Sequence, residues 1–219
     1  MKLSQTQWFA LFAAIIVDVI VGALVVLALE PYMGLYDTTL AALPLLLLPT
    51  VFFLRIGWKE KFGERAFLLP LRLALGYEFL IGGIEKLIDP TYLSSPGLIG
   101  LGAAAAPSDW ARGVFSMMLP NYAVFLLLIA TGELLVGLSM FLGGFTRLGA
   151  IGGIMLQLTF LFLLGWLSVS TFGINFVGGV AFLALAMLQA GRFVGVDQFI
   201  GPKLEKSGNR ILRFFGLLT

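Results

Sequence analysis

Three carboxylates stand in stretches of sequence that are otherwise apolar and long enough to cross a membrane. Asp18, Glu78 and Glu133 each lie well inside such a stretch. An ionisable side chain at membrane depth is costly, so each acid needs a partner, a water-filled cavity or a function. Burial favours the neutral form of a carboxyl group, whereas a neighbouring base favours the charged form. Glu78 and Glu133 are therefore either acids that take up and release protons, as in catalysis, or halves of fixed ion pairs.

A second acid follows Glu78 at a helical spacing. Glu85 lies seven residues after Glu78, so two turns of a helix project both from nearly the same side. One acid is then deep and the other is near the membrane surface. This pair predicts a path for protons between the two levels.

Three bases near the ends of apolar stretches are candidates for binding a substrate. Arg72 and Arg147 lie at similar depth near one membrane surface, where a long side chain can also simply reach the lipid head groups. Topology and lipid anchoring compete here with binding of a substrate or quinone oxygen. Lys86 lies beside Glu85 and three residues before Asp89, which makes it a base on an otherwise acidic side and a candidate for binding an anion.

The composition requires lipid as the solvent. Of the 219 residues, 59% are hydrophobic and 12% are charged, and the mean hydropathy is +1.01. A membrane core needs about 20 apolar residues per helix, so the length allows about six crossings. We therefore expect an all-α, polytopic membrane bundle, because isolated strands would leave backbone groups unsatisfied in lipid. The six apolar runs are Trp8–Leu29, Leu40–Ile56, Ala66–Ile88, Asn121–Leu142, Leu148–Val169 and Phe172–Ala190.

The distribution of bases predicts the orientation. In a six-span arrangement most bases fall on one side, which should be cytoplasmic. These are Lys2, Arg55, Lys59, Lys61, Arg65, Arg147, Arg192, Lys203, Lys206, Arg210 and Arg213. Both termini are then cytoplasmic in a multi-pass protein of the cell membrane. The first run contains Asp18 and is long, so we expect an uncleaved helix rather than a signal peptide.

The chain contains no cysteine and no histidine. This excludes thiol redox chemistry, disulfides, thiolate metal sites and the usual ligands of a transmembrane haem. We expect no haem or metal bound by this chain, and any redox role must use carriers from elsewhere. The net charge of +2 is explained by membrane orientation, so no nucleic-acid partner is expected.

Three parts of the chain are expected. Residues 1–65 hold two helices and a basic connector, residues 66–202 a four-helix core, and residues 203–219 a basic amphipathic tail that rests on the inner leaflet. The outer connection from Tyr92 to Pro120 carries Trp110, Val114, Met117 and Met118 at roughly helical spacing, which predicts a short helix at the membrane interface. That helix is either an interfacial anchor or a substrate lid. Glycines inside the spans indicate close packing of helices.

Two motifs resemble the DoxX/DoxD family of membrane proteins. The first is LRLALGYEFLIGGIEKLIDP, residues Leu71 to Pro90, with an arginine, a glycine-aromatic pair and a Gly-x-x-Lys element. The second is TGELLVGLSMFLGGFTRLGA, residues Thr131 to Ala150, with a glutamate and a Thr-Arg ending. The resemblance covers Ala66 to Pro202, and details at Pro90–Leu93 and Gly191–Asp197 are most similar to the DoxD branch, the small subunit of thiosulfate:quinone oxidoreductase.

The resemblance implies a four-helix core that works with a partner subunit. That complex would pass electrons from thiosulfate, which becomes tetrathionate, to a membrane quinone. Lys86 and Arg112 would receive the anionic sulfur compound, and Glu78 or Glu133 would handle protons. Two other functions stay open: a noncatalytic accessory subunit of a terminal oxidase complex, and a carrier of protons or small solutes. The expected partners are membrane lipids and either a second oxidoreductase subunit or terminal oxidase subunits.

Overall fold

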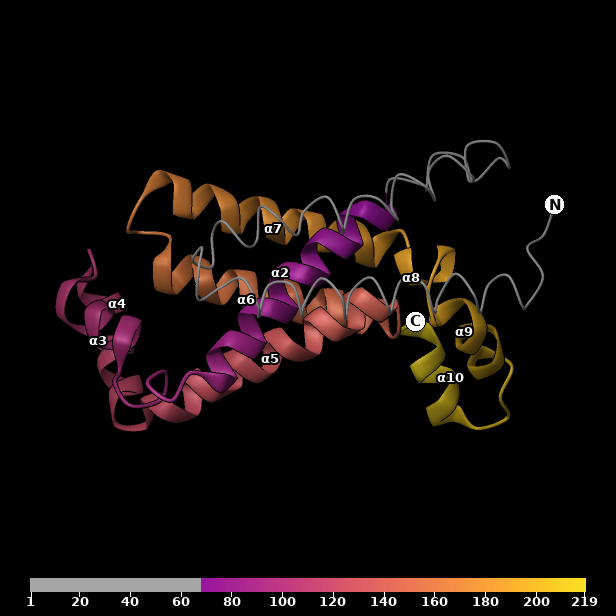
Figure 1. The fold of residues 1–219 in the computed structure, drawn as a ribbon, viewed down its shortest axis with the longest axis horizontal. Helices are drawn as coiled ribbons and strands as arrows, with labels where there is room; N and C mark the ends of the chain where they lie inside the picture. The colour runs from indigo at the N-terminus through magenta and orange to yellow at the C-terminus, as the bar shows by residue number, and fades with distance from the viewer. Residues whose placement is uncertain (1–67) are drawn as a thin grey trace, which may run out of the picture. The chain divides into compact units, whose positions relative to one another are not determined.

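The computed structural model describes residues 68–219, and every regular element in that part is a helix (Figure 1). The first two predicted spans and Asp18 lie outside the described residues. Residues up to Ala74 and residues Leu75–Thr219 form two compact units, and the second contains most of α2 and all the elements that follow it. The elements are α2 (Leu68–Ile88), α3 (Gly97–Ala105), α4 (Asp109–Met118), the 3₁₀ turn η2 (Leu119–Asn121), α5 (Tyr122–Leu142), α6 (Thr146–Leu164), α7 (Val169–Met187), α8 (Ala190–Phe193), α9 (Asp197–Glu205) and α10 (Arg210–Leu217).

Three helical segments of the described part are long and apolar enough to cross a membrane: Asp109–Leu142, α6 and α7. The 21 residues of α2 carry Arg72, Glu78, Glu85 and Lys86, so α2 is as long as α5 but much more charged. The all-helical membrane fold predicted from composition is confirmed. The number of crossings stays a prediction.

Helix α5 approaches α2 at positions where only glycine fits. A Cβ atom on Gly137 would lie 2.3 Å from the backbone nitrogen of Leu80, and one on Gly83 would lie 2.5 Å from that of Leu134. Both distances are far below van der Waals contact. The two helices therefore touch backbone to backbone, which is the small-residue packing typical of membrane bundles.

The boundary between the last two long helices differs from the apolar runs. We expected one run to continue to Val169, but α6 ends at Leu164 and α7 begins at Val169. Ser168 explains the break, because its hydroxyl accepts a hydrogen bond from the Thr171 backbone nitrogen at 3.0 Å. A pattern of hydrophobic residues does not reveal such a cap, because the cap depends on one polar side chain.

Helices α3 and α4 cover the end of the bundle at which α2 ends and α5 begins (Figure 1). Phe115 of α4 is fully buried and stacks on Phe162 of α6, with ring centroids 4.7 Å apart. It packs in a cluster with Ile99, Ile129 and Leu163. The short helix predicted around Trp110 is present as α4.

At the other end of the bundle, Asp197 holds the start of α6. It is fully buried, and its carboxylate accepts hydrogen bonds from the backbone nitrogens of Phe145 (2.6 Å) and Thr146 (2.8 Å) and from the Thr146 hydroxyl (2.7 Å). The Thr146 hydroxyl in turn accepts from the Gly191 nitrogen at 3.1 Å. A carboxylate here satisfies the first free N–H groups of α6 and opposes the positive end of its dipole. Asp197 thus joins α6, α8 and α9.

Replacing Asp197 by alanine should destabilise the protein by about 2 to 3 kcal/mol, because three donors, two of them in buried hydrogen bonds, lose their acceptor. Unfolding of the purified protein in mild detergent, followed by circular dichroism, measures the change. Asp109→Ala is the matched control, since Asp109 is an exposed acid at the start of α4. Equal stability of the two variants would contradict this role for Asp197.

Candidate functional site

A cavity of about 460 Å³ lies at the α3 end of the bundle. Its walls come from α2, the connection after α2, α3, α5, α6 and α7. The lining residues are Lys86, Thr91, Tyr92, Ser95, Gly97, Leu98, Ile99, Leu126, Ile129, Glu133, Phe160, Leu163, Leu164 and Asn175. Most of the wall is apolar, and we call this space the charged cavity because Lys86 and Glu133 both face it.

An ion pair forms the polar part of the wall. The Lys86 Nζ atom lies 2.7 Å from Oε2 and 3.0 Å from Oε1 of Glu133, and it also donates to the Gly82 carbonyl oxygen at 3.3 Å. The three donors of the ammonium group therefore have three acceptors. The Glu133 side chain is 7% exposed and that of Lys86 is 31% exposed. Lys86 thus reaches from the end of α2 to neutralise an acid in the middle of α5.

This pairing decides which ligands suit the charged cavity. Lys86 and Glu133 have opposite charges, so their contributions nearly cancel. A free dianion would meet the carboxylate as well as the ammonium group, and it would need Lys86 to leave Glu133. An uncharged molecule with an apolar body and one or two polar atoms matches the walls better.

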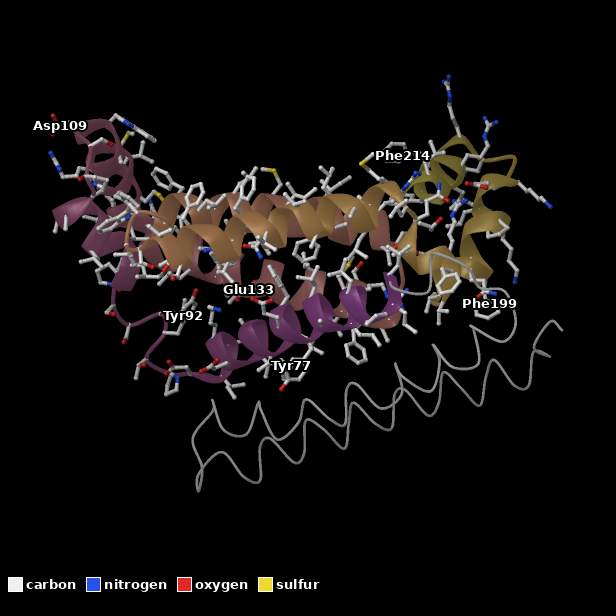
Figure 2. The ribbon with its side chains drawn as sticks, turned by 90° about the horizontal axis from the view of Figure 1, so that it is seen from above. Tyr77, Tyr92, Asp109, Glu133, Phe199 and Phe214 are labelled. Atoms are coloured by element: carbon white, nitrogen blue, oxygen red, sulfur yellow. The ribbon has the colours of Figure 1, made fainter. Side chains whose placement is uncertain are left out.

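Tyr92 borders the charged cavity on the side of the connection after α2. Its hydroxyl donates to the Leu126 carbonyl oxygen at 3.3 Å, and it lines the same cavity as Glu133 (Figure 2). Burial, with a smaller contribution from the negative charge of Glu133, raises the pKa of Tyr92 to about 12. The same connection is held by Asp89, which accepts from the backbone nitrogen (2.8 Å) and the hydroxyl (2.7 Å) of Thr91. These hydrogen bonds lower the pKa of Asp89, that from the Thr91 hydroxyl most.

The other acids predicted for the site lie elsewhere. Glu78 and Glu85 are both exposed on α2, and neither lines the charged cavity. Both lie on an exposed side of α2, in agreement with their seven-residue spacing. Of the acids proposed to handle protons, Glu133 is the one that reaches this cavity.

The predicted substrate-binding arginines are likewise dispersed. Arg72 is buried in the first part of α2. Arg112 pairs with Asp109 and donates to the Ala106 carbonyl oxygen at 2.6 Å, outside the cavity wall. Arg147 donates to the carbonyl oxygens of Ala186 (3.2 Å) and Leu217 (3.0 Å), so it ties the start of α6 to α7 and α10. Among residues 68–219, Lys86 is the one base in the cavity wall.

Sequence reasoning missed three polar residues that line cavities. Tyr92 was noticed only as part of a motif, and Asn175 of α7 and Gln157 of α6 were passed over. A signal for the two amides was present, because each interrupts an apolar run and an amide at membrane depth also needs a partner.

The charge of Glu133 can be read through Tyr92. The phenol should ionise near pH 12 in the folded protein, against about 10 for an exposed tyrosine. A raised pKa stabilises the fold fully below about pH 10, and this contribution is lost as the pH rises towards 12. Difference absorbance between the wild type and Tyr92→Phe isolates this titration. Glu133→Gln should shift the pKa of Tyr92 downwards, and an unchanged titration would show that the two side chains do not interact.

A known protein family matches the part of the chain that contains the charged cavity. The family model described as TQO small subunit DoxD matches residues 67–217, which is more than half of the chain. The matched region contains α2, α5, α6 and α7 and all the residues of the charged cavity. No solved structure matches the chain. The helical membrane core and the family match agree, and this protein belongs to the DoxD family.

Proposed function

We propose that this protein is the membrane subunit of a thiosulfate:quinone oxidoreductase and that the charged cavity binds the quinone head group. The family match supports the enzyme, and its description as a small subunit supports a partner subunit. The observation that carries the assignment of the site is the Lys86–Glu133 pair in an otherwise apolar wall. Both termini are proposed to be cytoplasmic, which puts the cavity near the outer surface.

The size and polarity of the charged cavity favour a quinone over thiosulfate. A volume of about 460 Å³ falls within the range of small-molecule sites, roughly 300 to 1,000 Å³. Leu126, Ile129 and Phe160 offer apolar contacts to a ring. A quinone oxygen accepts hydrogen bonds, and the donors proposed for it are the Lys86 ammonium group and the Tyr92 hydroxyl, each of which would exchange a present acceptor for the quinone oxygen. Thiosulfate oxidation is then assigned to the partner subunit, which supplies the electrons.

The chemistry assigned to this chain is proton transfer. Two thiosulfate ions give up two electrons and join through a sulfur–sulfur bond as tetrathionate. One quinone takes up these two electrons and two protons to become a quinol. Glu133 is proposed to pass protons to the quinone oxygens, and Lys86 holds the carboxylate in place and compensates its charge when it is ionised. No redox group on this chain is needed for these steps.

A double-mutant experiment separates this role from a purely structural one. Glu133→Gln and Lys86→Met should each destabilise the protein by about 3 to 5 kcal/mol, because each removes one partner of a mostly buried pair. The double variant should recover much of that stability. Proton transfer by a positioned acid contributes about a hundredfold or more, so the double variant should still lose about that factor in thiosulfate-dependent quinone reduction.

The measurement uses the intact complex purified from membranes, with quinone reduction followed optically and unfolding followed in parallel. Asp109→Asn serves as the control for removal of an acid outside the cavity wall. Full activity in a stable double variant would contradict the role of Glu133. A complex that assembles normally but has no thiosulfate-dependent activity in the wild type would instead support an accessory subunit.

A further inference from the structure

Helices α9 and α10 lie at the end of the bundle opposite to α3 and α4 (Figure 1). Figure 2 shows Phe214 of α10 towards this end and Asp109 of α4 at the other. In Figure 1, α10 turns across the direction of α5 and α6, which are long and apolar enough to cross the membrane. A helix that turns across membrane-crossing helices at their ends is in a position to lie along the membrane surface.

The second half of α10 is tied to the rest of the bundle. The Leu218 carbonyl oxygen, just after α10, accepts from the Leu148 backbone nitrogen in the first turn of α6 at 3.3 Å. Arg192 of α8 donates to the Gly216 carbonyl oxygen at 2.8 Å. A Cβ atom on Gly216 would lie 2.8 Å from the Glu205 backbone nitrogen, so α10 also packs closely on α9. These contacts fix the position of α10 relative to α6.

One side of α10 presents large apolar side chains. Ile211 is 66% exposed and Phe214 is 58% exposed, and Leu212 and Phe215 are exposed as well. These four positions share one side of a helix, and we call it the apolar side of α10. The Phe215 ring meets the Phe145 ring edge to face, with centroids 6.2 Å apart. The apolar surface therefore continues from α10 to the residue that precedes α6.

Four bases of the same segment have no acid beside them. They make no ion pair and no side-chain hydrogen bond in the part of the chain that the structure describes, and all four are exposed. The two acids of residues 197–219 are already engaged, because Asp197 caps α6 and Glu205 pairs with Arg192. The segment thus carries four free positive charges. The four bases are Lys203, Lys206, Arg210 and Arg213.

The combination of free bases and exposed apolar side chains indicates the kind of partner. Bases alone would be explained by membrane orientation, and apolar side chains alone by contact with lipid tails. A short helix that carries both is typical of the membrane interface, where apolar side chains enter the acyl boundary and long bases reach the head groups. The apolar surface shared with the start of α6 favours lipid over a protein partner. Anionic head groups complement the four charges, whereas zwitterionic head groups carry no net charge.

We propose that α10, with Lys203 and Lys206 of the preceding segment, is a binding surface for anionic phospholipids of the inner leaflet. The bases bind the head groups, and Ile211 and Phe214 enter the boundary of the acyl chains. Because α10 is hydrogen-bonded to the first turn of α6, lipid bound here stabilises the folded bundle. The inference is independent of the proposed function, since it involves neither the charged cavity nor a quinone.

The absence of cysteine from the chain allows one nitroxide label to report the depth of α10. Ile211→Cys, labelled in the full chain and placed in nanodiscs of phosphatidylglycerol and phosphatidylcholine, should be reached more easily by oxygen than by a water-soluble nickel chelate. Gly208→Cys is the matched control, because Gly208 is exposed before α10 and a Cβ there has no atom within 4 Å. The chelate should reach that label freely. Equal access of the chelate to both labels would overturn the proposed position of α10.

Thermal unfolding of the full chain in a nonionic detergent tests the choice of lipid. Added phosphatidylglycerol should raise the melting temperature more than phosphatidylcholine does, and salt should weaken this effect by screening. Arg213→Gln should raise the half-maximal phosphatidylglycerol concentration about fivefold, the effect of one base near an anionic surface. Arg112→Gln removes the same charge from α4, at the other end of the bundle, and should leave that concentration unchanged.

Replacing all four bases by glutamine should abolish the advantage of phosphatidylglycerol. These side chains are exposed and unpaired in the described part of the chain, so the variant should fold, and its melting curve reports whether it does. Equal stabilisation of this variant and the wild type by phosphatidylglycerol would overturn the proposal. Equal stabilisation of the wild type by the two lipids, or an effect that salt does not change, would overturn it without any variant.

Discussion

A carboxylate in the middle of a membrane helix must be compensated, and the pairing of Glu133 with Lys86 is the constraint around which the α3 end of this bundle is arranged. Water is scarce at that depth, so burying an unpaired charge would cost more free energy than the packing of one helix contributes. The glycine contacts of α2 with α5 bring the two backbones close enough for the Lys86 side chain to span the distance. Tight packing and charge compensation thus depend on each other.

At the opposite end of the bundle, the groups that need partners are backbone groups at helix ends. There the polar groups are mostly backbone N–H and C=O groups at helix ends, which lack partners within their own helices. Asp197 satisfies the start of α6, and Arg147 and Arg192 donate to carbonyl oxygens of α7 and of the C-terminal helix. These contacts hold the ends of α6 and α7 against the C-terminal helices. The α3 end, by contrast, has a mostly buried charge pair in the wall of a cavity.

The charged cavity differs from a smaller hollow of about 210 Å³ between α6 and α7. The charged cavity offers an acid and a base, whereas the smaller hollow is lined almost entirely by apolar surface. Proton transfer needs the first kind of wall. Asn175 belongs to both walls, so a change in the position of α7 would affect both spaces.

The sequence by itself determined the class of fold, since its hydrophobicity leaves a helical membrane bundle as the stable arrangement, and it correctly located α4 and the helical runs that became α2, α5, α6 and α7. It also marked Glu133 as an acid that needs a partner and Lys86 as a base that could bind an anion. Only the tertiary structure decided that they are each other's partner, across 47 positions of sequence. It also decided that Arg112 and Arg147 bond to other groups, and that the Gln157 Oε1 atom has no hydrogen-bond partner in the part of the chain that the structure describes. The physical reason is that the free-energy cost of burying a polar side chain can be read from its type and its apolar neighbours in sequence. The partner that offsets this cost depends on which helices approach each other in the folded protein.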